Sequence, residues 1–161
     1  MSDISIGPAS IDRSTVRSGG TTDINYTNPA NLSGTIKLIQ VYSAEAIEGL
    51  KAGIFYLVSG AIFHCRSAAL LGNVPANTQK IFTTELPVQK GDYLGYYWNA
   101  DTGQIEFDNL DGVGLYYISG DYVAVDSEAT YAFNSEYTTS CHGKGDSIAG
   151  SSIAITPYMM F

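Results

Sequence analysis

Turn-forming residues interrupt this chain about every ten positions, and no other feature restricts its fold as strongly. Glycine, asparagine and aspartate separate short runs of β-branched and aromatic residues. The runs that predict strands are residues 35–43, 51–58, 61–70, 78–86, 93–98, 104–107, 113–119, 122–126 and 129–133, followed by later strands near 148 and over 152–156. Roughly eight to eleven short strands at this spacing predict an all-β fold, a single-domain antiparallel β-sandwich that is jelly-roll-like.

One domain is expected over residues 1–161, because no proline-rich linker, charge block or low-complexity tract divides the chain. Its length suits one ordinary domain with a substantial core. The strands do not alternate with helical patterns, so a parallel sheet is not expected. An immunoglobulin-like topology stays open beside the jelly roll.

Local signals refine this outline. A short helix is predicted over residues 43–51, where Ser43 can cap it and Gly49 limits its length. The pair Ser59-Gly60 predicts a hairpin turn, and residues 99–103, with the sequence NADTG, predict a second hairpin. Pro87 is expected to end the strand before it.

Two glycine-aspartate pairs precede apolar or aromatic runs, in "KGDYLGYYW" at residues 90–98 and in "SGDYVAV" at 119–125. Such a pair could form a metal corner, carry a sugar platform or begin a strand. Glycine permits the backbone to turn, and aspartate can accept hydrogen bonds from nearby amides. Because the pair occurs twice in the same position before a run, we interpret both as turns.

Charge excludes several kinds of partner. Only 15% of the residues are charged, and the net charge is −8 with eight Lys and Arg. The basic residues are isolated, so nucleic-acid binding is not expected. The acidity opposes anionic membranes, and no apolar run has the length of a transmembrane helix.

The N-terminal sequence MSDISIGPAS has neither a basic start nor an apolar region, so no signal peptide is predicted. A surface with few charges is typical of secreted, virion and cell-surface β proteins. A virion or extracellular location is therefore expected.

The middle of the chain, from about Ile11 to Phe133, resembles an uncharacterised β-sandwich module found in tailed-phage structural proteins and environmental bacterial surface proteins. The resemblance implies an extracellular or virion module with binding or structural work, and it carries no catalytic residue. The segments that carry it are NPANLSGTIKLIQVYS, LKAGIFY, FHCRSAALLGNVPANTQKIF, LPVQKGDYLGYYW and GVGLYYISGD.

Each of the two cysteines, Cys65 and Cys141, lies beside a histidine. Two cysteines and two histidines could bind zinc, but neighbours on a strand point to opposite faces, so His64 and Cys65 would not both be ligands. A Cys65–Cys141 disulfide would fit an oxidising destination. Free thiols, with Cys65 in the core, are the favoured interpretation.

Acidic residues gather between positions 99 and 111. Asp101, Asp108 and Asp111 are candidate calcium ligands, because calcium prefers several oxygen ligands from a loop. Turns use the same residues without metal, so no cofactor is the main expectation. The carboxylates from Glu106 to Asp111 could also serve a hydrolase, although non-enzymatic function is the prediction.

Twelve tyrosines are present, an unusually high number. Side chains alternate between the two faces of a strand, so some of the rings at Tyr93, Tyr97, Trp98, Tyr116 and Tyr117 should point outward. Exposed aromatic rings suit protein interfaces and sugar stacking. These five residues are therefore candidate ligand or interface positions.

The apolar C-terminal residues are further interface candidates, and they suggest a homo-oligomer: Tyr158, Met159, Met160 and Phe161.

The leading hypothesis is a structural or decoration protein of a larger assembly, most simply a virion capsid or tail, whose partners are copies of itself or other assembly proteins. The alternative is a carbohydrate- or receptor-binding module, in which Tyr97, Trp98 or Tyr117 stacks on a glycan. The third hypothesis is the hydrolase.

Overall fold

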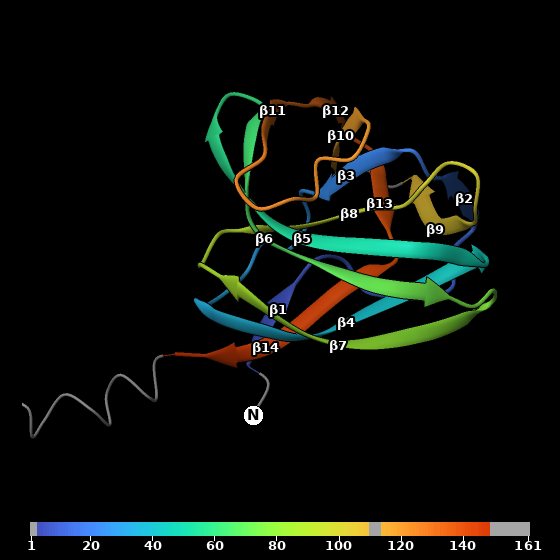
Figure 1. Ribbon diagram of the computed structural model, residues 1–161, viewed down its shortest axis with the longest axis horizontal. Helices are drawn as coiled ribbons and strands as arrows, with labels where there is room; N and C mark the ends of the chain where they lie inside the picture. The colour runs from blue at the N-terminus through green and yellow to red at the C-terminus, as the bar shows by residue number, and fades with distance from the viewer. Residues whose placement is uncertain (1–2, 110–113, 149–161) are drawn as a thin grey trace, which may run out of the picture.

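The computed structural model describes residues 3–109 and 114–148, which form fourteen strands and no helix (Figure 1). Every strand pairing is antiparallel, which confirms the predicted all-β, sandwich-like fold. The described residues contain no helix with the length and apolar character that a membrane crossing requires. The predicted interface residues Tyr158 to Phe161, Asp111, and the predicted strand over 152–156 lie outside the described residues.

The strands form two sheets of seven. One sheet has the order β1-β14-β4-β9-β13, with β7 beside β4 and β2 beside β9. It consists of β1 (Ile4–Ile6), β2 (Thr15–Ser18), β4 (Gly34–Glu45), β7 (Thr78–Val88), β9 (Gln104–Asn109), β13 (Tyr137–Thr139) and β14 (Cys141–Ser147).

The other sheet has the order β11-β6-β5-β8-β3-β10-β12. It consists of β3 (Thr21–Asn25), β5 (Ile47–Ser59), β6 (Ile62–Val74), β8 (Tyr93–Tyr97), β10 (Leu115–Ser119), β11 (Glu128–Thr130) and β12 (Ala132–Asn134). The hairpin predicted at Ser59-Gly60 is confirmed, since it joins β5 to β6 and Gly60 has a φ of +57°.

A first core fills the space between the two sheets. Alternate residues of β4 face it, and Ile39 and Val41 are fully buried while Leu38 lies on the other face, as predicted. Its fully buried members are mostly aliphatic: Ile6, Ile36, Ile39, Val41, Ile47, Leu50, Ile54, Leu94, Tyr96, Trp98, Ile105 and Cys141.

A second core lies on the opposite face of the β3–β5–β6–β8 sheet. Residues 120–131, the covering segment, cross this face in orange in Figure 1. Val123 and Tyr131 of this segment pack against side chains from the sheet below. The buried members of the second core are Ile24, Phe55, Phe63, Cys65, Val123 and Tyr131.

Four local predictions are wrong, and the first three concern residues 43–51, 99–103 and 122–126. Residues 43–51 form no helix, because Ser43, Ile47 and Leu50 are buried as parts of β4 and β5, and Gly49 has a φ of +67° that helices do not use. Residues 99–103 make no hairpin, since β8 and β9 belong to different sheets. Residues 122–126 form no strand and lie in the covering segment.

Pro87 does not end its strand either. It lies inside β7, paired with Thr35, which is tolerated because β7 pairs with β4 alone.

The glycine-rich sequence CHGKGDS forms strand β14. Its glycines allow close approach, since a Cβ at Gly145 would lie 2.0 Å from the Thr35 carbonyl oxygen and one at Gly143 would lie 2.7 Å from Ile6 Cγ2. The missing side chains thus let β14 fit tightly between β1 and β4 in the sheet.

Both glycine-aspartate pairs are turns, as interpreted from the sequence. Gly91 and Gly120 have φ values of +92° and +102°. Asp92 accepts a hydrogen bond from the Gln89 amide at 2.8 Å, and Asp121 accepts one from the Val123 amide at 3.0 Å. Asp92 is buried and also binds the Arg66 guanidinium, whereas Asp121 pairs with Lys51 near the surface.

Candidate functional site

Two of the predicted tyrosines, Tyr93 and Tyr116, meet in one aromatic group. With Tyr26 and Phe133 they form what we call the aromatic surface. The Tyr26 and Tyr93 rings stack with centroids 5.2 Å apart, and Tyr116 lies 5.5 Å from Tyr26 and 4.6 Å from Phe133. The rings meet because β8, β3, β10 and β12 are consecutive in the sheet, with Tyr116 directly opposite Phe133.

This aromatic surface continues the second core outward. Phe63 contacts both Tyr93 and Tyr116 from the buried side. Tyr26 and Phe133 are 43% and 46% exposed, respectively. Burial, together with the neighbouring Tyr26 phenol, raises the pKa of Tyr93 to about 12, so its hydroxyl stays neutral at physiological pH. The result is an uncharged aromatic face at the edge of a buried cluster.

The other three candidates do not join this surface. Tyr97 packs half-buried on the second core. Tyr117 points to the opposite face of its strand, where the Arg17 guanidinium lies 5.6 Å from its ring centroid. Trp98 is completely buried in the first core and stacks on Tyr96, so the prediction that it could stack on a sugar is wrong.

Sequence reasoning missed the two most exposed rings of the aromatic surface. Phe133 lies in a predicted strand but was not distinguished from core residues. Tyr26 continues the alternation of Thr22 and Ile24 along "TTDINY", yet this run was not predicted as a strand. A period-two reading of that run would have placed Tyr26 on the face of Ile24.

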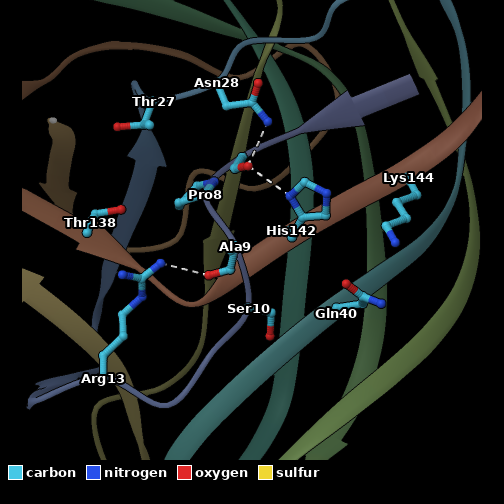
Figure 2. A pocket seen from close by; sticks show the side chains of 11 residues that line it. Pro8, Ala9, Ser10, Arg13, Thr27, Asn28, Gln40, Thr138, His142 and Lys144 are labelled. Atoms are coloured by element: carbon cyan, nitrogen blue, oxygen red, sulfur yellow. Dashed lines mark hydrogen bonds between the residues drawn. The ribbon is translucent and has the colours of Figure 1, made fainter. Parts of the chain in front are cut away.

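A polar pocket of about 590 Å³ opens beside β14 (Figure 2). The segment after β1 forms one wall, and His142 and Lys144 of β14 form another. The Gly7 carbonyl accepts hydrogen bonds from Asn28 Nδ2 at 2.9 Å and from His142 Nδ1 at 2.8 Å. Asn28 and His142 are labelled in Figure 2. The remaining lining residues are Pro8, Ala9, Ser10, Arg13, Thr27, Gln40 and Thr138.

Three hydrogen bonds hold the Arg13 guanidinium in the lining of this pocket. Its guanidinium donates to the Ala9 carbonyl at 2.8 Å, to Ser140 Oγ at 2.9 Å and to Asp108 Oδ2 at 3.1 Å. The side chain is only 6% exposed, so its charge is compensated mainly by Asp108.

The carboxylates considered for a hydrolase, Glu106 and Asp108, lie on the same face of β9. Burial and then the neighbouring Asp12 raise the pKa of Glu106, whereas hydrogen bonds from the Ser14 hydroxyl and amide lower that of Asp108. Diverging pKa values are typical of acid–base pairs. Here, however, Arg13 and Ser14 donate to these carboxylates, and neither carboxylate lines the polar pocket.

The candidate calcium ligands are separated. Asp101 lies in the turn before β9, and Asp108 lies near the other end of that strand, bound to Arg13 and Ser14. Within residues 3–109 and 114–148, no three His, Cys, Asp or Glu side chains are grouped as a metal site would require.

Both cysteines are buried free thiols, which agrees with the favoured interpretation and not with the alternative of a Cys65–Cys141 disulfide. The sheet separates them, because Cys65 belongs to the second core and Cys141 to the first. Burial raises the pKa of Cys65 to about 11 and that of Cys141 to about 12, so neither is a ready thiolate nucleophile at neutral pH.

No protein-family model, curated protein or solved structure matches this chain.

Proposed function

We propose that this chain is a non-enzymatic module that builds or decorates a larger assembly, such as a virion, by burying the aromatic surface against a second copy of itself. The observation that carries this proposal is the joint exposure of Tyr26 and Phe133 above an aromatic cluster. Single exposed apolar residues are common on monomers, but contiguous aromatic rings are typical of interface centres.

Charge favours this surface over the rest of the molecule for self-association. Two copies with a net charge of −8 repel each other over most orientations. The aromatic surface consists of four uncharged rings, so contact there brings few charges together. Tyrosine and phenylalanine also lose little side-chain entropy when they are buried in an interface.

The absence of a catalytic role is part of the same proposal. Glu106 and Asp108 accept hydrogen bonds from Arg13 and Ser14. These bonds tie the segment after β1 to β9. Their contacts are those of structural carboxylates, and a reaction would have to break them first.

The test is the mass in solution of the double variant Tyr26→Ala, Phe133→Ser, measured by light scattering over a range of concentrations. The unmodified chain should form a multiple of 17.2 kDa, and the variant should dissociate toward 17.2 kDa. Removing two interface anchors of this type should weaken association at least about tenfold.

The matched control is the double variant Leu70→Ser, Ile81→Ser, since these residues are exposed apolar side chains outside the aromatic surface. It should keep the mass of the unmodified chain. A chain that is monomeric at high concentration, or a control that dissociates equally, would overturn the proposal.

Sugar stacking is the second candidate function, and the exposed Tyr26 ring favours it. A glycan array would then show binding by the unmodified chain that Tyr26→Ala loses, with no change in mass.

A further inference from the structure

His64 connects β6 to the covering segment through two carboxylates. Its Nδ1 lies 2.9 Å from Glu128 Oε1, and its Nε2 lies 3.1 Å from Asp126 Oδ1. An ionised carboxylate can only accept hydrogen bonds, so both contacts are hydrogen bonds only when both ring nitrogens carry a proton. The imidazolium therefore bridges the two carboxylates, whereas the neutral ring can donate to only one of them. We call these three residues the histidine clasp.

The other charged and titratable side chains around His64 do not supply a competing charge. The Tyr56 ring of β5 lies against the imidazole, with the ring centroids 5.1 Å apart, and the Arg66 guanidinium lies 4.4 Å from the Tyr56 ring centroid. Arg66 is compensated by Asp92, whose Oδ2 lies 2.6 Å from Arg66 Nε. The two carboxylates of the clasp therefore determine the charge state of His64.

The clasp is closed on the acidic side of neutrality and open on the alkaline side. Hydrogen bonds with Glu128 and then Asp126 raise the pKa of His64 above its ordinary value of 6.5. The clasp is therefore fully formed below pH 6.5 and is lost as the pH rises through the higher folded-state pKa. In the open clasp, a ring-nitrogen lone pair faces a carboxylate oxygen, so one of the two contacts becomes repulsive.

One continuous run of chain connects the clasp to the aromatic surface. Glu128 begins β11, which pairs with β6, and only Tyr131 separates the end of β11 from β12, which pairs with β10. Tyr131 is 4% exposed, and its ring centroid lies 5.6 Å from that of Phe63, which contacts two rings of the aromatic surface from the buried side. Phe133 is the middle residue of β12. A clasp that holds β11 on β6 thus also fixes the strand that positions the Phe133 ring.

We propose that the histidine clasp regulates self-association: the closed clasp fixes β11 and β12 and so orders the aromatic surface for a second copy, and the open clasp weakens this contact. The inference rests on the proposed function, because it describes the regulation of the same surface. Loss of the His64 proton also brings each copy to its net charge of −8, so repulsion between copies acts in the same direction. Mildly acidic conditions should therefore favour the assembly.

The test is the dissociation constant for self-association of the full chain at pH 6 and at pH 8, measured by sedimentation velocity at one ionic strength. The constant should rise about three- to tenfold from pH 6 to pH 8. A single contact with an exposed carboxylate contributes little, but each of the two copies loses one clasp.

His64→Gln keeps a hydrogen-bond donor but has no titratable charge. Its dissociation constant should be the same at both pH values and close to that of the unmodified chain at pH 8. His142→Gln is the matched control, because the chain has only two histidines and His142 lies on β14, outside the aromatic surface. This control should keep the full pH dependence. Circular dichroism spectra identical to that of the unmodified chain exclude misfolding of either variant.

The step within one copy is measured separately, in the double variant Tyr26→Ala, Phe133→Ser that weakens association. Hydrogen-exchange protection factors of residues 128–134 should be lower at pH 8 than at pH 6 in this variant, because the clasp holds the strand without a partner. Adding His64→Gln should abolish the difference.

The outcomes distinguish this inference from the proposed function. A chain that is monomeric at every concentration and at both pH values would overturn the proposed function, and the regulation with it. A chain that associates equally at pH 6 and pH 8, or that loses its pH dependence through His142→Gln, would overturn the regulation alone. Protection factors of residues 128–134 that do not change with pH would contradict the connection between the clasp and β12.

Discussion

The first core and the second core differ in how completely the chain encloses them. The first core lies between two hydrogen-bonded sheets, and aliphatic side chains that are fully buried dominate it. The second core is aromatic, is closed on one side by the covering segment, and reaches the surface at Tyr26 and Phe133. Enclosure by sheets favours stability, whereas the partly open aromatic cluster leaves rings available for a partner.

The largest expected effect tests the enclosure of the first core. Trp98→Ala removes a fully buried indole that stacks on Tyr96 and donates to the Gly103 carbonyl. The free energy of unfolding should fall by about 3–5 kcal/mol, because a large cavity forms that rigid sheets cannot close. Urea denaturation followed by fluorescence or circular dichroism measures this loss.

Tyr97→Ala is the comparison, because Tyr97 is the last residue of β8, next to Trp98 in the chain, and packs on the second core. Because Tyr97 is only half-buried, its truncation should cost about 1–2 kcal/mol. A loss for Tyr97→Ala as large as that for Trp98→Ala would show that the second core is as fully enclosed as the first.

A smaller effect should separate the two glycine-aspartate turns. Asp92→Ala leaves the Arg66 guanidinium without the carboxylate that binds it at 2.6 Å and 3.1 Å. Because Asp92 is 3% exposed, unfolding should require about 2–4 kcal/mol less free energy. Chemical denaturation of the variant provides the measurement.

Asp121→Ala, in the turn that begins the covering segment, is the matched control. The Lys51–Asp121 pair is exposed, so its loss should cost no more than about 1 kcal/mol. Equal losses at both turns would contradict the difference in burial between them.

The smallest effect concerns pH and the edge of the second core. His64 on β6 lies 2.9 Å from Glu128 Oε1 and 3.1 Å from Asp126 Oδ1, which ties the covering segment to the sheet. Hydrogen bonds with Glu128 and then Asp126 raise the pKa of His64 above its ordinary value of 6.5. Its contribution to stability is therefore complete below pH 6.5 and is lost as the pH rises through the higher folded-state pKa.

Hydrogen exchange should be measured at pH 5.5 and at pH 8 and expressed as protection factors. The protection factors of residues 120–131 should be lower at pH 8. His64→Gln should abolish this dependence. His142 gives the opposite sign, because its lowered pKa removes stability as the pH falls below 6.5. Unchanged protection of the covering segment in the unmodified chain would show that His64 does not fasten it.

The sequence pattern correctly predicted a strand where the strand buries one of its two faces in the first core. In residues 35–43, Ile39 and Val41 alternate with half-exposed residues, so period two is visible. Ser43 to Leu50 carried helical signals, but burial of Ile47 and Leu50 in the first core outweighed them. Local propensity could not indicate that β8 and β9 join different sheets, since that depends on distant strands.

The candidate sites show the same limit. Alternation separated Tyr116 from Tyr117 correctly, but the meeting of Tyr93, Tyr116 and Tyr26 depends on β3 lying between β8 and β10. The polar pocket was not predicted, because its lining comes from segments as distant as Ser10 and His142. Single residue types without a shared motif give no sequence signal for such a site.

The pairing of β1 with β14 has a mechanical consequence. Asp3 and Ser147 lie at the same end of this antiparallel ladder, where the Asp3 amide donates to the Gly145 carbonyl and the Ser147 amide to Asp3 Oδ1. Tension that pulls these two residues apart would load the inter-strand hydrogen bonds from one end of the ladder. The bonds would therefore break one after another in an unzipping geometry, and not all together in a shearing geometry. Displacing β1 would withdraw Ile4 and Ile6 from the first core. Residues 7–10 would follow, so stretching the module would next dismantle one wall of the polar pocket.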